Sequence, residues 1–184
     1  MRIISGKYKG RVLNPPGNLP VRPTTDFAKT GLFNILESRF DFSELNCLDL
    51  FSGTGNISLE FISRGSQSVT AVDLDFGCIQ FIKEMGKKLD IKNLNPLRSD
   101  CLKYIEETKH FFDIIFADPP FEVAVRDEIH AIVMKRKLLN SDGFLILEHE
   151  SKQNYQHLSG FNFSRQYGNV TFSFFSNLEQ IHQP

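Results

Sequence analysis

The sequence predicts an α/β fold in which helical crossovers join the strands of a mostly parallel sheet. From Cys47 to about Glu150, short apolar runs alternate with segments of helical spacing, a pattern typical of repeated strand–helix–strand units. A glycine-rich turn follows the first run, as it does in sheets that bind ligands at their strand ends. Two last apolar runs surround Gly168-Asn169, which predicts an antiparallel hairpin near the end of the chain.

The spacing of apolar residues sets the expected limits of each element. We expect parallel strands at 46–51, 68–73, 96–98, 112–117 and 144–150. We expect the intervening helices at 56–64, 76–89, 101–107 and 123–137. The terminal hairpin is expected to pair 161–167 with 170–175.

Two further elements precede this alternation. A helix over 21–40 is expected to open at Arg22-Pro-Thr-Thr-Asp26, because threonine and aspartate are favourable helix caps. Residues 3–5 and 11–13 flank a turn-prone segment with two glycines and predict a small β-hairpin. The length of 184 residues fits a single domain. Its expected parts are 1–20 (basic hairpin and loop), 21–40 (helix) and 41–184 (α/β core).

Composition narrows the class of protein. A hydrophobic content of 41% and a charged content of 23% are ordinary for a soluble globular chain. No apolar run reaches the length of a membrane helix or resembles a signal peptide, so we expect a cytoplasmic protein with no membrane partner. Three dispersed cysteines and five histidines lack disulfide or zinc spacing, which predicts reduced thiols and no metal.

Charge is distributed unevenly along the chain. Residues 1–40 carry seven lysines and arginines against two acids, a net charge of +5, so the remaining residues carry −6. Contacts with nucleic-acid phosphates come from such local clusters, although a solvated basic surface would give the same pattern. The expected RNA-binding residues are Arg2, Lys7, Lys9, Arg11, Arg22 and Lys29.

The most informative stretch runs from Asn46 to Glu60, where an apolar strand, a glycine turn and a helix follow one another. Glycines allow a ligand to approach the backbone, and the helix N-terminus behind them offers unpaired N–H groups. The dinucleotide fingerprint needs a third glycine where this chain has Ser58. Asp49, four residues before Gly53, repels a pyrophosphate and suits a cation. The pattern D-x-F-x-G-x-G resembles the first motif of S-adenosylmethionine-dependent methyltransferases.

Acidic residues at the other strand ends are further candidates for cofactor binding, because these ends meet at one edge of a parallel sheet. Asp73 ends the second strand and is expected to bind two ribose hydroxyls, whereas helix capping is the favoured interpretation of Asp75. Asp100 and Cys101 follow the third strand and are candidates to hold the adenine. The expected cofactor-binding residues are Asp49, Phe51, Ser52, Gly53, Gly55, Asp73, Leu74, Asp100, Cys101 and Thr24.

Asp118-Pro119-Pro120-Phe121 follows the fourth strand and is the candidate catalytic segment. Two prolines stiffen the backbone and remove two N–H donors, which leaves carbonyl groups and the Asp118 carboxylate as acceptors. Phe121 adds a flat apolar face. Such a site suits an exocyclic amine on a stacked nucleobase, held at the Asp118 carboxylate and the Pro119 carbonyl with its lone pair directed at a methyl donor. Asp118 is also a candidate general base.

Motifs spread over nearly the whole chain resemble the RsmD-type 16S rRNA (guanine(966)-N(2))-methyltransferase family. They are Met1-Arg-Ile-Ile-Ser-Gly6, Arg22-Pro-Thr-Thr-Asp26, Leu32-Phe-Asn-Ile-Leu36, Asp49-Leu-Phe-Ser-Gly-Thr-Gly55 and Asp118-Pro-Pro-Phe121. The resemblance implies a Rossmann-like class I methyltransferase fold with a seven-stranded sheet and S-adenosylmethionine as cofactor. It implies that the acceptor is the N2 amine of a guanine in 16S rRNA, within an assembled small ribosomal subunit. We expect the enzyme to be a monomer.

Other functions share parts of this pattern. An amino-methyltransferase that acts on adenine N6 in DNA or on a protein glutamine would use the same pocket motifs. A non-catalytic assembly factor would bind rRNA through the basic N-terminal residues alone. A dinucleotide-dependent oxidoreductase is disfavoured by Ser58. The family pattern carries Arg-Glu where this chain has Lys29-Thr30, and the role of Glu148 at the end of the fifth strand stays open.

Overall fold

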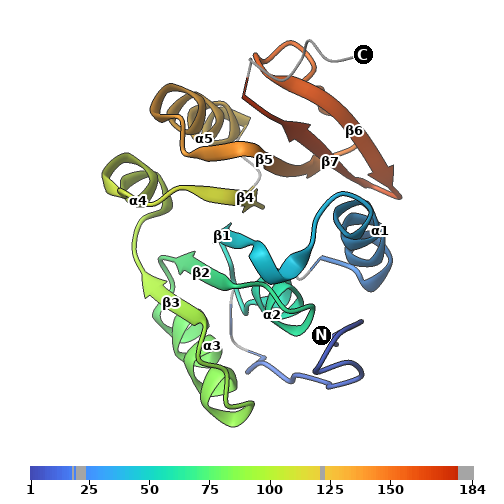
Figure 1. Cartoon of the computed structure of the whole chain (residues 1–184), viewed down its shortest axis with the longest axis vertical. Helices are drawn as coiled ribbons and strands as arrows, with labels where there is room; N and C mark the ends of the chain where they lie inside the picture. The colour runs from blue at the N-terminus through green and yellow to red at the C-terminus, as the bar shows by residue number, and fades with distance from the viewer. Residues whose placement is uncertain (18, 20–23, 121–122, 178–184) are drawn as a thin grey trace.

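The computed structural model describes residues 1–17, 19, 24–120 and 123–177 (Figure 1). In this part of the chain seven strands form one sheet in the order β3-β2-β1-β4-β5-β7-β6. The strands are β1 (Asn46–Leu50), β2 (Ser68–Asp73), β3 (Leu94–Arg98), β4 (Phe112–Ala117), β5 (Leu139–Glu150), β6 (Phe161–Tyr167) and β7 (Val170–Phe175). The first five are parallel, and β7 is antiparallel to both β5 and β6. The predicted α/β class, the mostly parallel sheet and the C-terminal hairpin are confirmed.

Helices cover both faces of the sheet. They are α1 (Asp26–Glu37), α2 (Asn56–Ser63), α3 (Phe76–Lys88), α4 (Cys101–Glu107) and α5 (Val123–Arg136), with a 3₁₀ turn η1 at Phe42–Glu44. Two buried clusters pack between the helices and the sheet. Helices α1, α2 and α3 contribute to one cluster, and α4 and α5 contribute to the other. None of the described helices has the length and apolar character that crossing a membrane requires.

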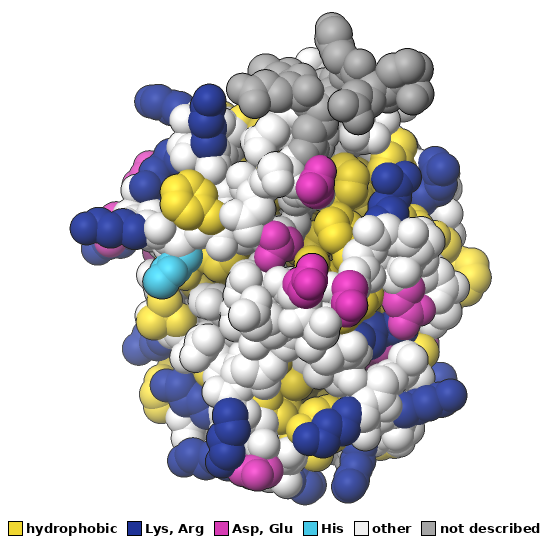
Figure 2. Space-filling view, viewed as in Figure 1, with side chains coloured by type: hydrophobic (Ala, Val, Ile, Leu, Met, Phe, Trp, Pro, Cys, Tyr) yellow, Lys and Arg dark blue, Asp and Glu magenta, His cyan; other side chains and the backbone are white. Residues whose placement is uncertain are grey.

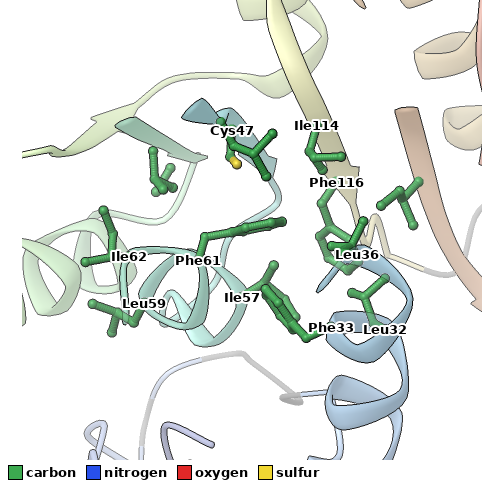
Figure 3. Close-up of a cluster of buried hydrophobic side chains, with 14 of the residues drawn as sticks. Leu32, Phe33, Leu36, Cys47, Ile57, Leu59, Phe61, Ile62, Ile114 and Phe116 are labelled. Carbon is green, nitrogen blue, oxygen red and sulfur yellow. The ribbon is translucent and has the colours of Figure 1, made fainter. Parts of the chain in front are cut away.

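The first cluster joins α1 and α2 to the centre of the sheet (Figure 3). Phe33 of α1 and Phe61 of α2 meet edge to face with their ring centroids 4.8 Å apart, and both are fully buried. Ile114 and Phe116 of β4 extend the cluster from the sheet. Each such side chain stabilises the fold by roughly 1.5–3 kcal/mol. This packing fixes the N-termini of α1 and α2 beside the carboxyl ends of β1 and β4.

Helix α1 is shorter than the predicted 21–40. It begins at Asp26, because the Thr25 side chain accepts a hydrogen bond from Ala28 N–H and so caps it. It ends at Glu37, after which the N–H groups of Ser38 and Arg39 still bond to carbonyls of the last turn. Arg22 and Pro23 lie outside the described residues.

The predicted N-terminal hairpin is only partly correct. An antiparallel bridge joins Arg2 to Val12, and the N–H groups of Ile3 and Leu13 donate to the carbonyls of Arg11 and Met1 on either side of it, but neither predicted strand extends beyond this bridge. The segment between them is also held by α2, because the N–H groups of Ile4 and Ser5 donate to the buried Glu60 carboxylate. The two sides of the arm therefore bond to each other, and the first side bonds to a helix side chain as well. We call residues 1–13 the N-terminal arm.

Strand β5 begins earlier than the predicted 144. Leu139 already pairs with Phe112, and the register then shifts before Phe144 pairs with Ile114. Residues 141–143, expected to precede the strand, therefore form an irregularity within it. Gly143 permits it, because a Cβ there would come within 2.8 Å of the Asp113 carbonyl oxygen.

Candidate active site

The strand order reverses between β1 and β4, which lie side by side in the sheet. In open α/β sheets ligands bind at such a switch point, outside the carboxyl ends of the strands. The turn after β1 and the Asp118-Pro119-Pro120 segment after β4 therefore share one edge. The structure brings together the two motifs that the sequence singled out.

The turn after β1 has an unusual backbone conformation. Phe51, Gly53 and Gly55 all have positive φ angles, of 56°, 51° and 75°. Phe51 is the strained member, because a side chain disfavours this region, and its N–H donates to the buried Cys101 Sγ at 3.2 Å. At Gly55 a Cβ would also come within 2.9 Å of Ile82. The need for a glycine at position 55 can therefore come from packing against α3, just as it can come from access of a ligand to the backbone.

Asp49 has a structural partner that the sequence did not predict. Its Oδ2 accepts hydrogen bonds from the Ser58 N–H at 2.9 Å and from the Ser58 hydroxyl, so it caps α2 from within β1. The residue is 1% exposed, and this burial raises its pKa to about 7. Ser58 thus replaces the third glycine of a dinucleotide motif with a donor to Asp49.

Asp73 lies where β2 ends, with its carboxylate toward the glycine turn. Its Oδ2 accepts the Gly53 N–H at 2.8 Å and its Oδ1 accepts the Asp75 N–H at 2.8 Å. A carboxylate has about four acceptor positions, so both oxygens can still accept from a ligand. The next residue, Leu74, is 62% exposed and adds an apolar face. These features fit a ribose with an attached base.

The acids after β2 and β3 act as helix caps. Asp75 accepts the Cys78 N–H and caps α3, which confirms the favoured interpretation. Asp100 accepts the Lys103 N–H and caps α4, while remaining exposed to solvent. Cys101 is 3% exposed, so its thiol supports the turn through Phe51 rather than facing a ligand directly.

A carboxylate pair occupies the ends of β4 and β5. Burial raises the pKa of Asp118, whereas the nearby Arg126 guanidinium lowers it. Glu148 is 6% exposed, and burial followed by the Asp118 charge raises its pKa above the usual range. The Thr24 hydroxyl donates to Glu148 Oε2 at 2.9 Å. We therefore expect Asp118 to carry the charge of the pair and Glu148 to hold the proton.

Arg126 of α5 links these two strand ends and was missed by sequence reasoning. Its Nε donates to the Glu148 carbonyl and its NH2 to the Pro119 carbonyl, both at 2.8 Å. The residue is 3% exposed, and its NH1 has no hydrogen-bond partner among the described residues. The Pro119 carbonyl, expected to receive a substrate amine, thus already accepts one hydrogen bond and keeps one lone pair. Phe121 lies outside the described residues.

Replacing Arg126 by methionine is expected to move the acid limb of the pH–rate profile to higher pH. The guanidinium favours the ionised form of Asp118, so its loss raises that pKa and a higher pH is needed to ionise the group. The measurement is single-turnover methyl transfer across pH 5–9. Arg136→Met is the matched control, because Arg136 also lies on α5 and bonds to a carbonyl, that of Ile105. An unchanged acid limb in Arg126→Met would show that Arg126 does not act on Asp118.

Lys29 was predicted to bind RNA, and the structure contradicts this. It is 1% exposed, and its Nζ donates to the Arg2 carbonyl at 2.7 Å and to Asn56 Oδ1 at 2.8 Å. The ammonium also lies 3.3 Å from Glu60 Oε2. Lys29 therefore joins α1, α2 and the N-terminal arm inside the protein, where RNA cannot reach it.

The other residues predicted to bind RNA are spread along the N-terminal arm. The tip of the arm lies at the far end of α2, because Lys7 N–H donates to the Ser63 carbonyl and the Tyr8 hydroxyl donates to the Leu89 carbonyl. The eight residues of α2 separate it from the glycine turn by about 12 Å. Arg2, at the near end, pairs with Asp26 at 2.9 Å. Exposed residues on the arm include Lys7, Lys9 and Arg11, whereas Arg22 lies outside the described residues.

Acidic and basic side chains are separated on the surface. Figure 2 shows acidic side chains gathered across the middle of one face, with lysine and arginine mainly around its margin. Such a field favours a cationic ligand at the centre and phosphate contacts at the margin. Among the described residues, no group of three or more histidine, cysteine, aspartate or glutamate side chains is arranged to hold a metal ion.

Comparisons with known proteins agree with this geometry. A family model described as Conserved hypothetical protein 95 matches residues 1–176. Ribosomal RNA small subunit methyltransferase D from Buchnera aphidicola subsp. Baizongia pistaciae is 31% identical over 154 residues, which cover 84% of this chain and 78% of that protein. The solved structure of Escherichia coli yhhF has a TM-score of 0.83 and 26% identity, and the match covers 96% of this chain and 97% of that one.

One further solved structure is similar to this chain in fold alone. The Thermus thermophilus 16S rRNA N2 G1207 methyltransferase, solved in complex with AdoMet and guanosine, has a TM-score of 0.66 and 22% identity. The match covers 86% of this chain and 45% of that protein. The class I methyltransferase fold that the sequence predicted is thereby confirmed.

Proposed function

This chain belongs to the family described as Conserved hypothetical protein 95, and on that basis we propose that it transfers a methyl group from S-adenosylmethionine to the exocyclic N2 amine of a guanine in 16S rRNA. The observation that carries the proposal is the meeting of two motifs at one switch point. The glycine turn and Asp73 stand on one side of it, and Asp118 with its two prolines stands on the other. The related protein from Buchnera is named for methylation of small-subunit rRNA.

The residues present fit S-adenosylmethionine. Ser52 in the glycine turn has a buried hydroxyl with no hydrogen-bond partner among the described residues, which suits a polar group of a ligand. Asp73 would hold the ribose, and the exposed Leu74 would lie against the adenine. Asp49 places a buried carboxylate beneath the turn, which favours a cation. When bound, the cofactor supplies an electrophilic methyl group on a sulfonium centre.

The chain's own residues would act on the amine. The Asp118 carboxylate accepts one N–H of the guanine amine and the Pro119 carbonyl accepts the other, which directs the nitrogen lone pair toward the methyl donor. Arg126 fixes the Pro119 carbonyl through its 2.8 Å hydrogen bond and favours the ionised form of Asp118 by opposing the rise in its pKa that burial causes. Asp118 then takes the proton that the methylated amine releases.

The proposal also covers the domain organisation, oligomeric state and cellular location of the protein and the form of its RNA substrate. We propose that the chain is one methyltransferase domain, a cytoplasmic monomer that acts on rRNA within an assembled small subunit. The exposed Lys7, Lys9 and Arg11 would contact phosphates at a distance from the target base. The target guanine must leave its stack to reach Asp118, which is easiest in an RNA loop.

Methyl transfer from labelled S-adenosylmethionine tests the proposal. Small subunits from cells that lack this gene, naked 16S rRNA, DNA and protein are each offered as acceptor, and the labelled nucleotide is then mapped. We expect label on one guanine N2 of small-subunit rRNA. Label only in DNA or protein would replace the proposed substrate, and no transfer to any acceptor would favour a non-catalytic rRNA-binding role.

A further inference from the structure

We infer that the groove between α1 and β6 is a second contact site for the RNA, where an unpaired nucleobase beside the target guanine stacks on Phe27. This inference rests on the proposed function and adds a subsite that binds no part of the cofactor. The groove has a volume of about 380 Å³. It is lined by residues on one side of α1 and the residue that follows it, from Phe27 to Ser38, and by Tyr167 of β6. That volume is within the range of ligand pockets, roughly 300–1,000 Å³.

The groove opens at the same edge of the sheet as the active site. Strands β5 and β6 are both antiparallel to β7, so they run in the same direction and Tyr167 lies at the carboxyl edge. Tyr167 pairs with Val170, which in turn pairs with Glu150 at the end of β5. Phe27 follows three residues after Thr24, whose hydroxyl contacts Glu148. The cofactor residues lie toward β2 and β3, so the groove extends the site on the acceptor side.

Phe27 has the features of a stacking platform. Its side chain is 69% exposed, and its ring centroid is 5.7 Å from that of Tyr167 in an edge-on arrangement. Tyr167 is fixed against α1 because Gly31 has no side chain, and a Cβ there would come within 2.1 Å of the ring. Phe27 thus contacts a fixed ring while most of its side chain stays exposed to solvent. Nucleobases stack on such faces with little regard to sequence.

Two arginines lie beside the groove, one directly after its lining residue Ser38 and the other two residues before Tyr167. The exposed Arg39 and Arg165 lie over the Phe163 ring, with their guanidinium carbons 4.9 Å and 5.2 Å from its centroid. The acids of α1 do not offset them, because Asp26 and Glu37 are each ion-paired with another arginine. Asn34, exposed along the groove, has a side-chain amide without a hydrogen bond to the described residues.

A strand of RNA matches the aromatic end of the groove and the arginines beside it. A flat base meets the open face of Phe27, the Asn34 amide is available to its hydrogen-bonding edge, and the backbone phosphates lie toward Arg165 and Arg39. An apolar peptide would use the aromatic end and would leave the two arginines unpaired. The positive charge beside the groove therefore favours RNA as the occupant.

Fluorescence anisotropy tests the inference, with a labelled single-stranded 16S rRNA fragment that contains the target guanine and with S-adenosylhomocysteine present. We expect Phe27→Ala to weaken binding roughly tenfold, the loss of about one stacked base. Phe27→Tyr should retain wild-type affinity. Phe111→Ala is the matched control, because Phe111 is 57% exposed but precedes β4 at the opposite edge of the sheet. Arg165→Gln should lower the salt dependence of binding by about one phosphate contact.

Several results would overturn the inference. Equal affinity of wild type and Phe27→Ala, or no RNA binding at all, removes the stacking site. A loss that appears with assembled subunits but not with naked RNA assigns the groove to a ribosomal protein instead. If wild type binds the fragment through Phe27 but transfers no methyl group to rRNA or subunits, the proposed function fails while the groove remains an RNA site.

Discussion

Replacing Asp118 by alanine is expected to slow methyl transfer by at least about 100-fold, with no loss of affinity for S-adenosylhomocysteine. The variant removes the acceptor proposed to orient the amine but leaves Asp73 and the glycine turn intact. It should fold, because burial raises the pKa of Asp118 and its charge therefore opposes the folded state. The measurements are single-turnover methyl transfer and calorimetric titration with S-adenosylhomocysteine.

Asp118→Asn separates two roles of this residue. Asparagine keeps a carbonyl acceptor but cannot take a proton, so we expect it to retain more activity than alanine if orientation of the amine dominates. Activity as low as that of alanine would assign the effect to the charge. Asp127→Ala, an exposed acid of α5, is the control. Normal turnover in Asp118→Ala would contradict the assigned role.

The parts of the site that could be predicted are those with local signals. The glycines after β1 and the acids at the strand ends are marked by their position relative to apolar runs, and the sheet follows from the alternation of strands and helices. Arg126 gave no such signal, because an arginine in a helix is usually a surface residue. Its partners, the carbonyls of Pro119 and Glu148, become neighbours only when β4 pairs with β5.

Lys29 is a different case, because its position did carry a signal. It lies three, four and seven residues before Leu32, Phe33 and Leu36, which is the spacing of the buried side of α1. Its charge suggested RNA, whereas its periodicity indicated the core. The N-terminal hairpin pairs over fewer residues than predicted, and its local turn residues could not reveal that Glu60 would bind the N–H groups of Ile4 and Ser5.

Glu60 organises a buried ionic cluster that holds the N-terminal arm to the helices. Its carboxylate accepts the N–H groups of Ile4 and Ser5 at 2.8 and 3.0 Å, and it pairs with Arg64 at 3.0 Å and with Lys29 at 3.3 Å. The Glu60 side chain is fully buried and that of Lys29 is 1% exposed. Burial lowers the pKa of Lys29, although the Glu60 charge opposes this shift. The ammonium therefore depends on Glu60 to remain charged.

Glu60→Ala is expected to lower the free energy of unfolding by about 3–5 kcal/mol, because it leaves Lys29 as a buried cation without its counter-charge. In a Lys29→Met background the same change should cost at least about 1 kcal/mol less, since no ammonium is then left unpaired. Urea unfolding of the four proteins gives this double-mutant cycle, and Lys152→Ala serves as an exposed control whose ion pair with Glu150 should contribute little. Strictly additive losses would show that Lys29 and Glu60 are not coupled. Hydrogen exchange at Ile4 and Ser5 should accelerate in Glu60→Ala, because release of the arm exposes the two N–H groups that the carboxylate now holds.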